Sequence, residues 1–297
     1  MKKILGAYNN GNYTVVIFED GTKIRANKED KLVARFPESI DMKISDKCDR
    51  GCPMCHECST PDGGLAPFLL DHPLFRNLHP YTELALGGGN VFEHPDLFPF
   101  LTKMRDQRII CNVTVHLDHF MENALTITAL VKSGLLHGVG VSISHPVTKY
   151  ELMMLQSIPN VVVHVIAGLV DFDTLESLSN ENIKLLILGY KDYGRGINYL
   201  STHPEVDENI QKLEDVLPLI KDRFTSISFD NLALEQLHMR EHMTKKEWDE
   251  SYMGDDGQFT MYIDMVRDEY AKSSTSPRRR IENNNIEVLF EDIKDGF

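Results

Sequence analysis

The chain has 297 residues, of which 42% are hydrophobic and 26% are charged, and its formal net charge is −14. This composition is typical of a globular protein, and no apolar run approaches the ~18 residues of a membrane-spanning helix. Proteins that grip a long phosphate backbone usually carry a basic face, so the acidic balance argues against a nucleic acid partner. The one basic run, residues 278–280, is expected to be a solvated tail segment.

Residues 1–40 predict a small antiparallel β element. Residues 13–18 are rich in β formers, an Asp-Gly turn follows, and residues 22–26 alternate between apolar and polar side chains. A third strand is expected at residues 32–36. The first residues include two lysines but only a short apolar stretch, so we expect no signal peptide, and cysteines in reduced form predict a cytoplasmic protein.

Residues 41–235 show an alternation of strand-like and helix-like segments. Apolar runs of strand length occur at residues 42–44, 84–86, 113–115, 139–143, 161–166, 184–188 and 227–229. Helix-like segments lie between them, for example at residues 97–107, 124–133 and 171–178. This alternation predicts βαβ units with a parallel sheet, and six or seven such units fit a partial or complete barrel. In such barrels functional groups lie at the carboxyl ends of the strands.

Residues 236–297 form a C-terminal extension that is rich in charge and methionine. We expect a helix at residues 262–271 and a loop at residues 273–277.

Four of the five cysteines lie within eleven residues. The first three, Cys48, Cys52 and Cys55, have the spacing C-x3-C-x2-C, and Cys58 follows. Thiolates are soft anionic ligands that suit iron–sulfur clusters. With only three protein ligands, one iron of a cubane iron–sulfur cluster would have a free coordination position. A small molecule could bind there, as it does at the open position of a catalytic zinc site.

Two other roles for these cysteines fit the sequence less well. Disulfide scaffolds spread their cysteines through a small secreted chain, whereas here only Cys111 lies outside the run. A zinc site is the stronger rival, but a zinc ribbon needs a second pair of ligands 12–20 residues away, and none is present. We expect Cys58 to be unligated and Cys111 to be a small core residue.

The cysteine spacing, with the hydrophobic Met54 directly before the third cysteine, resembles that of the radical S-adenosylmethionine (radical SAM) enzymes. A second motif supports the resemblance: family members carry Gly-Gly-Glu-Pro after their second strand. This chain has Gly88 and Gly89 there, but Asn90 replaces the acid and the proline is missing. Asn90 can still accept a hydrogen bond from an ammonium group.

The resemblance implies a partial (β/α)6 TIM-like barrel with the cysteine loop directly after its first strand. It implies that Cys48, Cys52 and Cys55 hold a [4Fe-4S] cluster whose open iron binds S-adenosylmethionine. Reduction by a flavodoxin- or ferredoxin-type partner would cleave this cofactor to a 5′-deoxyadenosyl radical, which abstracts hydrogen from a substrate.

In similar enzymes polar groups at the strand ends contact the cofactor. The candidates here are Met54, Gly88, Gly89, Asn90, Ser142, Ser144 and Arg195. For the two serines the alternative is a polar strand terminus without a ligand, and for Arg195 it is an exposed turn. His116 with Asp118 is a candidate for the substrate site, whereas His164 is expected in the core.

Three functions remain open at this stage. The first is a radical SAM enzyme that modifies a peptide or protein, with the N-terminal sheet as a strand-pairing dock. The second is a radical SAM enzyme that modifies a nucleotide or small metabolite. The third is a non-catalytic iron–sulfur or zinc-binding protein. No cysteine follows Cys111, which argues against auxiliary clusters.

Overall fold

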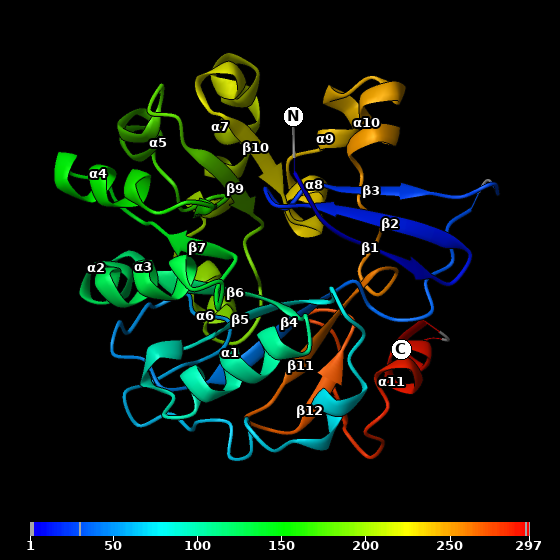
Figure 1. The fold of residues 1–297 in the computed structure, drawn as a ribbon. Coiled ribbons are helices and arrows are strands. Elements are labelled where there is room, and N and C mark those ends of the chain that lie inside the picture. The colour runs from blue at the N-terminus through cyan, green and yellow to red at the C-terminus, as the bar shows by residue number, and fades with distance from the viewer. Residues whose placement is uncertain (1–2, 30, 295, 297) are drawn as a thin grey trace.

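The computed structural model describes residues 3–29, 31–294 and 296, and it contains two β-sheets (Figure 1). Met1 and Lys2, part of the segment behind the signal-peptide expectation, lie outside the described residues. The first sheet is antiparallel and lies at the N-terminus. Its strands are β1 (Ile4–Asn10), β2 (Tyr13–Phe18) and β3 (Lys23–Ala26). A small N-terminal antiparallel β element is therefore present, with β1 as a strand that the sequence did not indicate.

The strand predicted at residues 32–36 is wrong, because two asparagine side chains bind the amides that a strand would pair. The Oδ1 atom of Asn12 accepts a hydrogen bond from the Val33 amide at 2.8 Å. The Oδ1 atom of Asn10 accepts from the amides of Arg35 and Phe36 at 2.8 and 3.1 Å. This segment therefore runs beside the first sheet as irregular chain.

The second sheet has ten strands among the described residues, in the order β10-β9-β8-β7-β6-β5-β4-β11-β12-β13. Neighbouring strands from β4 to β10 are parallel. Their bounds are β4 (Ser39–Ser45), β5 (Glu83–Gly88), β6 (Ile110–His116), β7 (Gly138–Ser142), β8 (Val161–Ile166), β9 (Lys184–Leu188) and β10 (Ser226–Phe229). Every apolar run assigned to a strand of the α/β region is thus a strand, and the predicted α/β fold with a large parallel sheet is confirmed.

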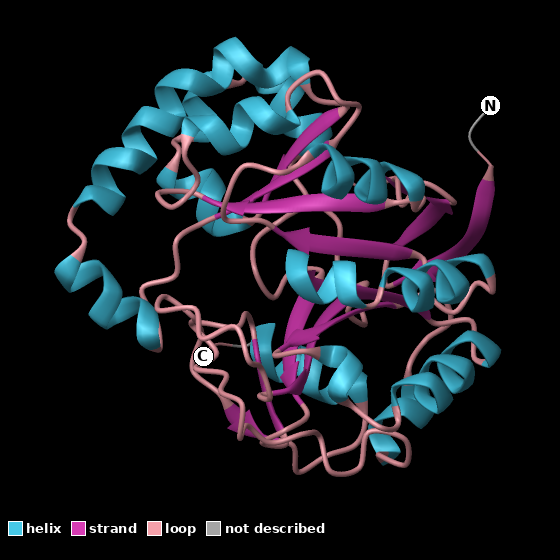
Figure 2. Cartoon of the chain, turned by 90° about the vertical axis from the view of Figure 1, so that its left-hand side faces the viewer, coloured by secondary structure: helices cyan, strands magenta, loops and turns pink. Residues whose placement is uncertain are grey.

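Helices follow these strands and lie along the outer side of the sheet, while the strands occupy the inside (Figure 2). They are α1 (Leu97–Asp106), α2 (Leu117–Glu122), α3 (Ala124–Lys132), α4 (Lys149–Ser157), α5 (Phe172–Leu178), α6 (Arg195–Thr202), α7 (Glu205–Ile220) and α8 (Asn231–Gln236). The described residues also form the short 3-10 helices η1 (Pro73–Asn77), η2 (Val91–Glu93) and η3 (Lys221–Arg223). The core lies between the sheet and these helices, as β6 illustrates. Its buried Val113 and Val115 join this core, and Thr114 and His116 on its other face are half-buried.

The last part of the chain extends the large sheet. Strand β11 (Thr260–Asp264) pairs in parallel with β4, and β12 (Glu269–Ala271) turns back beside β11. The remaining elements are α9 (Met239–His242), α10 (Lys245–Ser251), β13 (Arg279–Arg280) and α11 (Ile286–Lys294). The helix predicted at residues 262–271 is wrong, because four consecutive residues of β11 are buried and leave no alternation to read. The loop predicted at residues 273–277 is present.

Within the described part of the chain, no helix is both long and apolar enough to cross a membrane.

A substitution at Ile263 tests whether β11 is a buried strand of the core. Ile263 is fully buried in the core, so we expect Ile263→Ala to lower the free energy of unfolding by about 2–5 kcal/mol. Leu125 on α3 is 87% exposed, and Leu125→Ala should change the same quantity by less than about 0.5 kcal/mol. Denaturant titration followed by circular dichroism measures both, and equal effects would contradict a core strand here.

Candidate metal centre

Four of the five cysteines lie on a loop, residues 46–60, that directly follows β4 at the carboxyl edge of the parallel strands; we call it the cysteine loop. Its two ends are held together where the Cys48 amide donates to the Thr60 carbonyl at 2.8 Å. Between them, the Cys55 amide donates to the Cys52 carbonyl and the Cys58 amide to the Cys55 carbonyl, each at 3.2 Å. These turns keep the cysteines on one short, compact stretch of chain.

All five cysteines are free thiols. Cys48, Cys52 and Cys55 are half-buried, whereas Cys58 is exposed. Burial, and next to it the charge of Cys55, raises the pKa of Cys48 and of Cys52. Cations bound at the loop would offset the mutual repulsion of its thiolates. Cys111 is buried, which raises the pKa of its thiol to about 12 and fits a core residue.

The glycines after β5 press against the chain that leads into the cysteine loop. Gly88 has a φ of +104°, and a Cβ atom there would lie 2.3 Å from the Ser45 carbonyl oxygen. A Cβ atom at Gly89 would lie 2.2 Å from the Lys47 carbonyl oxygen. Only glycine permits this approach of two backbones, so both residues fix the start of the cysteine loop.

Asn90 lies at the same junction and is buried. Its amide donates to the Lys47 carbonyl at 2.7 Å, and its Oδ1 atom accepts from the Phe92 amide at 3.1 Å. Asn90 therefore caps the short helix η2. Its predicted contact with an ammonium group of the cofactor stays a prediction.

Arg195, at the start of α6, braces the middle of the cysteine loop. Its Nε atom donates to the Cys52 carbonyl at 3.1 Å, and one terminal nitrogen donates to the Ser59 carbonyl at 3.0 Å. Its own amide donates to the Cys55 carbonyl at 3.2 Å. The guanidinium thus orders the loop through carbonyl groups; the contact with the cofactor predicted for Arg195 stays a prediction.

A second set of charged residues holds the beginning of the loop to helix α2, which directly follows β6. His119 Nε2 lies 2.8 Å from Asp49 Oδ1, and Arg50 donates to Asp118 at 2.6 Å. Ligand atoms of Cys48, Asp49 and His119 lie within 4.8 Å of one another and could hold a metal ion. Sequence reasoning pointed to Asp118 but did not find the Asp49–His119 pair, because this pair joins the cysteine loop to the distant helix α2.

The two candidate serines differ in environment. Ser142 is the last residue of β7, half-buried, and in register between His116 of β6 and His164 of β8. Ser144 lies beyond the strand and is exposed. Burial lowers the pKa of His164 to about 4, so this histidine is neutral at pH 7. The structure therefore brings only Ser142 into a row of polar strand-end residues.

A small cavity of about 50 Å³ adjoins the cysteine loop. The residues that line it are Met54, His56, Ile166, Leu169, Leu188, Gly189, Tyr190 and Lys191. Burial and the neighbouring Lys191 lower the pKa of His56 to about 3, which keeps its imidazole neutral. Met54 thus faces an apolar recess formed by the ends of β8 and β9.

Comparison with protein-family models gave no match, and no curated protein matches the chain. Among solved structures, SuiB from Streptococcus suis aligns with 98% of this chain and 88% of its own, at a TM-score of 0.62 and 12% identity. SuiB bound to S-adenosylmethionine and SuiB bound to the precursor peptide SuiA each give a TM-score of 0.59 at 13% identity. These two alignments cover 88% of this chain and span about two thirds of SuiB, at 67% and 66%.

The chain therefore has the mixed α/β fold, with a large parallel sheet, that SuiB has. The fold expected from the cysteine and glycine motifs is therefore one that this chain shares with SuiB, of which one structure holds S-adenosylmethionine.

The packing of the residue before Arg195 gives a test of the loop's position. Gly194 has a φ of +57°, and a Cβ atom there would lie 2.2 Å from the His56 carbonyl oxygen and 3.0 Å from Cys58 Sγ. Gly194→Ala should therefore displace the cysteine loop, costing about 1–3 kcal/mol of stability beyond the backbone strain. The exposed Cys58 thiol should then react with a thiol reagent at a different rate.

Gly134→Ala is the matched control, because Gly134 has a φ of +69° with nothing within 4 Å of its Cβ position. Both variants place a Cβ atom at a positive φ, and the ψ of −128° at Gly194 adds backbone strain there, in a region that is essentially reserved for glycine. Equal free energies of unfolding in the two variants, with unchanged Cys58 reactivity, would contradict this packing of the loop.

Proposed function

We propose that this chain is a radical SAM enzyme in which Cys48, Cys52 and Cys55 hold a [4Fe-4S] cluster that binds S-adenosylmethionine. One observation carries the proposal. The three-cysteine loop follows the first parallel strand, and Gly88 and Gly89 pack against it, in a fold shared with a protein whose structure holds S-adenosylmethionine. We further propose that the strands β4 to β10 form the partial (β/α)6 barrel of this family.

The donor set fits such a cluster. Three half-buried thiols lie on one loop, and burial raises the pKa of two of them, Cys48 and Cys52. The loop is shaped by hydrogen bonds to its carbonyl groups, from Arg195 and from its own amides, so the sulfur atoms are left to bind metal. When bound and reduced, the cluster would supply the electron that cleaves S-adenosylmethionine to a radical able to abstract hydrogen.

The chain's own residues would bind and orient the cofactor. Met54 and the apolar ends of β8 and β9 offer a recess for an apolar part of it. Gly88, Gly89 and Asn90 would present backbone and amide groups beside the loop. Ser142 and Ser144 would supply hydroxyl groups at the end of β7, and Arg195 would hold the loop in place.

The substrate that we propose is a peptide or protein. The support is the shared fold with SuiB, of which one structure holds the precursor peptide SuiA. The one-electron donor would be a flavodoxin- or ferredoxin-type protein.

Metal loading separates the cluster from a mononuclear metal at Cys48, Asp49 and His119. After anaerobic reconstitution we expect about four iron atoms per chain and cleavage of S-adenosylmethionine on reduction. Cys52→Ser and Cys55→Ser should abolish both, because each removes a cluster ligand. Iron analysis and chromatography of the cleavage products measure the outcome.

Two further variants serve as controls. Cys58→Ala should keep its iron and its cleavage activity, because we expect this thiol to be unligated. His119→Gln should also keep its iron. A protein that loses metal in His119→Gln but retains it in Cys52→Ser would instead be a mononuclear metal protein, and the proposal would be wrong.

A further inference from the structure

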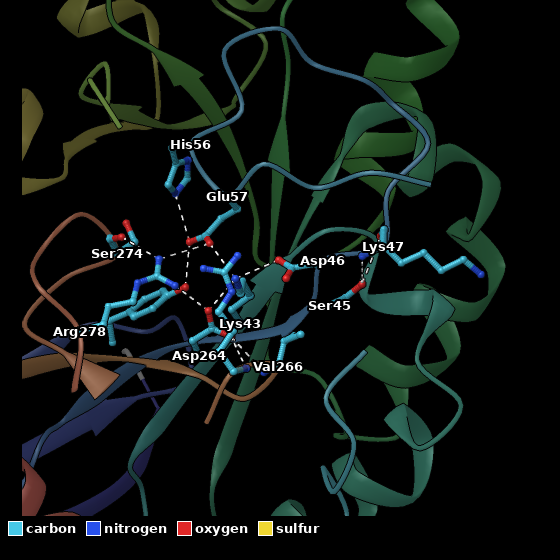
Figure 3. Close-up of polar contacts among 12 residues, drawn as sticks. Lys43, Ser45, Asp46, Lys47, His56, Glu57, Asp264, Val266, Ser274 and Arg278 are labelled. Atoms are coloured by element: carbon cyan, nitrogen blue, oxygen red, sulfur yellow. Dashed lines mark hydrogen bonds and ion pairs between the residues drawn. The ribbon is translucent and has the colours of Figure 1, made fainter. Parts of the chain in front are cut away.

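The basic run at residues 278–280 does not behave as one solvated segment. Arg279 is 44% exposed and pairs with Asp292 on α11. The side chain of Arg278 is only 9% exposed and points back toward β4 and the cysteine loop (Figure 3). The prediction that residues 278–280 form a solvated segment is therefore wrong for Arg278. None of the sequence motifs assigns a role to this residue.

Arg278 contacts two carboxylates from distant parts of the chain. One terminal nitrogen lies 2.6 Å from Asp264 Oδ2 at the end of β11. The other lies 3.5 Å from Glu57 Oε2 in the cysteine loop and donates to the Ser274 carbonyl at 3.0 Å. The guanidinium thus joins the strand beside β4 to the residue two positions after Cys55.

Lys43 of β4 binds the same two carboxylates as Arg278, so these charged groups form one ionic network. The Lys43 ammonium group lies 2.6 Å from Asp264, 3.1 Å from Glu57 and 2.9 Å from Asp46. The Tyr262 hydroxyl of β11 donates to the other oxygen of Glu57 at 2.8 Å. Figure 3 shows the side chains of Lys43 and Arg278 converging on Glu57 and Asp264, whereas the Lys47 side chain points away.

This network is nearly closed to water. The exposed fractions are 1% for Lys43, 0% for Asp264 and 7% for Glu57. Buried charges are stable only while they are paired, and removing one partner leaves the others uncompensated. Three carboxylates already face two cations, so loss of Arg278 would add to the excess of negative charge beside the cysteine loop.

We propose that Arg278, acting through Glu57, positions the cysteine loop and so makes the C-terminal segment part of the cluster site. The inference rests on the proposed function. Arg278 is a positioning residue: it touches no cysteine, but it fixes the carboxylate that follows Cys55. Groups that orient metal ligands from outside the ligand set commonly change metal affinity by about 10–100-fold when replaced.

The test compares Arg278→Met with Arg279→Met, two adjacent substitutions that remove the same charge. Both proteins are loaded anaerobically with iron and sulfide, and transfer of iron to a chelator is followed by the loss of cluster absorbance. We expect Arg278→Met to release iron about ten times faster than the wild type, at the lower end of that range. Arg279→Met should match the wild type, because its partner Asp292 lies on α11.

Glu57→Gln is the second variant, and it decides the matter if Arg278→Met does not fold. It keeps the shape of the side chain and an acceptor for Tyr262 but removes the charge that Arg278 and Lys43 hold. The same acceleration of iron release is expected. Ile263→Ala destabilises the same strand without changing any charge, so it measures the effect of lower stability alone.

The outcomes separate this inference from the proposed function. A wild-type protein that takes up no iron–sulfur cluster overturns the proposed function and this inference with it. A loaded wild type whose release rate is unchanged in Arg278→Met and Glu57→Gln overturns the inference alone. So does an equal acceleration in Ile263→Ala, because the effect would then be a general loss of stability.

Discussion

Parallel pairing of β4 with a strand on each side is the constraint on which the rest of the structure depends. β4 pairs with β5 through residues Ser39–Ser45 and with β11 through Ser39–Lys43. Because all three strands run in the same direction, their carboxyl ends meet at one edge. The cysteine loop begins at the end of β4 on that edge. Residues that follow β5 and β11 therefore lie beside the loop as soon as the strands have paired.

The cysteine loop needs such support because it has little regular structure of its own. Its neighbours hold it by different kinds of contact. The glycines after β5 pack backbone against backbone, Arg195 binds carbonyl groups, and Glu57 enters a buried ionic network. Each contact acts on the chain beside the cysteines rather than on sulfur. For the proposed cluster, this support would set the positions of the ligands before any metal arrives and so would lower the entropic cost of binding.

Sequence reasoning predicted the parallel strands because buried βα units leave a local signal: short apolar runs between helix-like segments. The cysteine and glycine motifs were equally local. Strand β11 was misread because it is buried on both faces and shows no alternation. The ionic network carries no sequence signal at all. Lys43, Glu57, Asp264 and Arg278 are ordinary charged residues until the pairing of β4 with β11 brings segments more than 200 residues apart into contact.

The C-terminal segment is joined to the sheet by the buried ionic network as well as by apolar packing, and the two kinds of contact do different things. An apolar contact between β11 and the loop would stabilise the fold but would tolerate sliding, because dispersion forces have little directionality. A carboxylate held by Lys43, Arg278 and Tyr262 is fixed in direction as well as in distance. Desolvation makes such a group costly to misplace. The network is therefore better suited to fixing the position of Glu57, and of the cysteines beside it, than to adding stability.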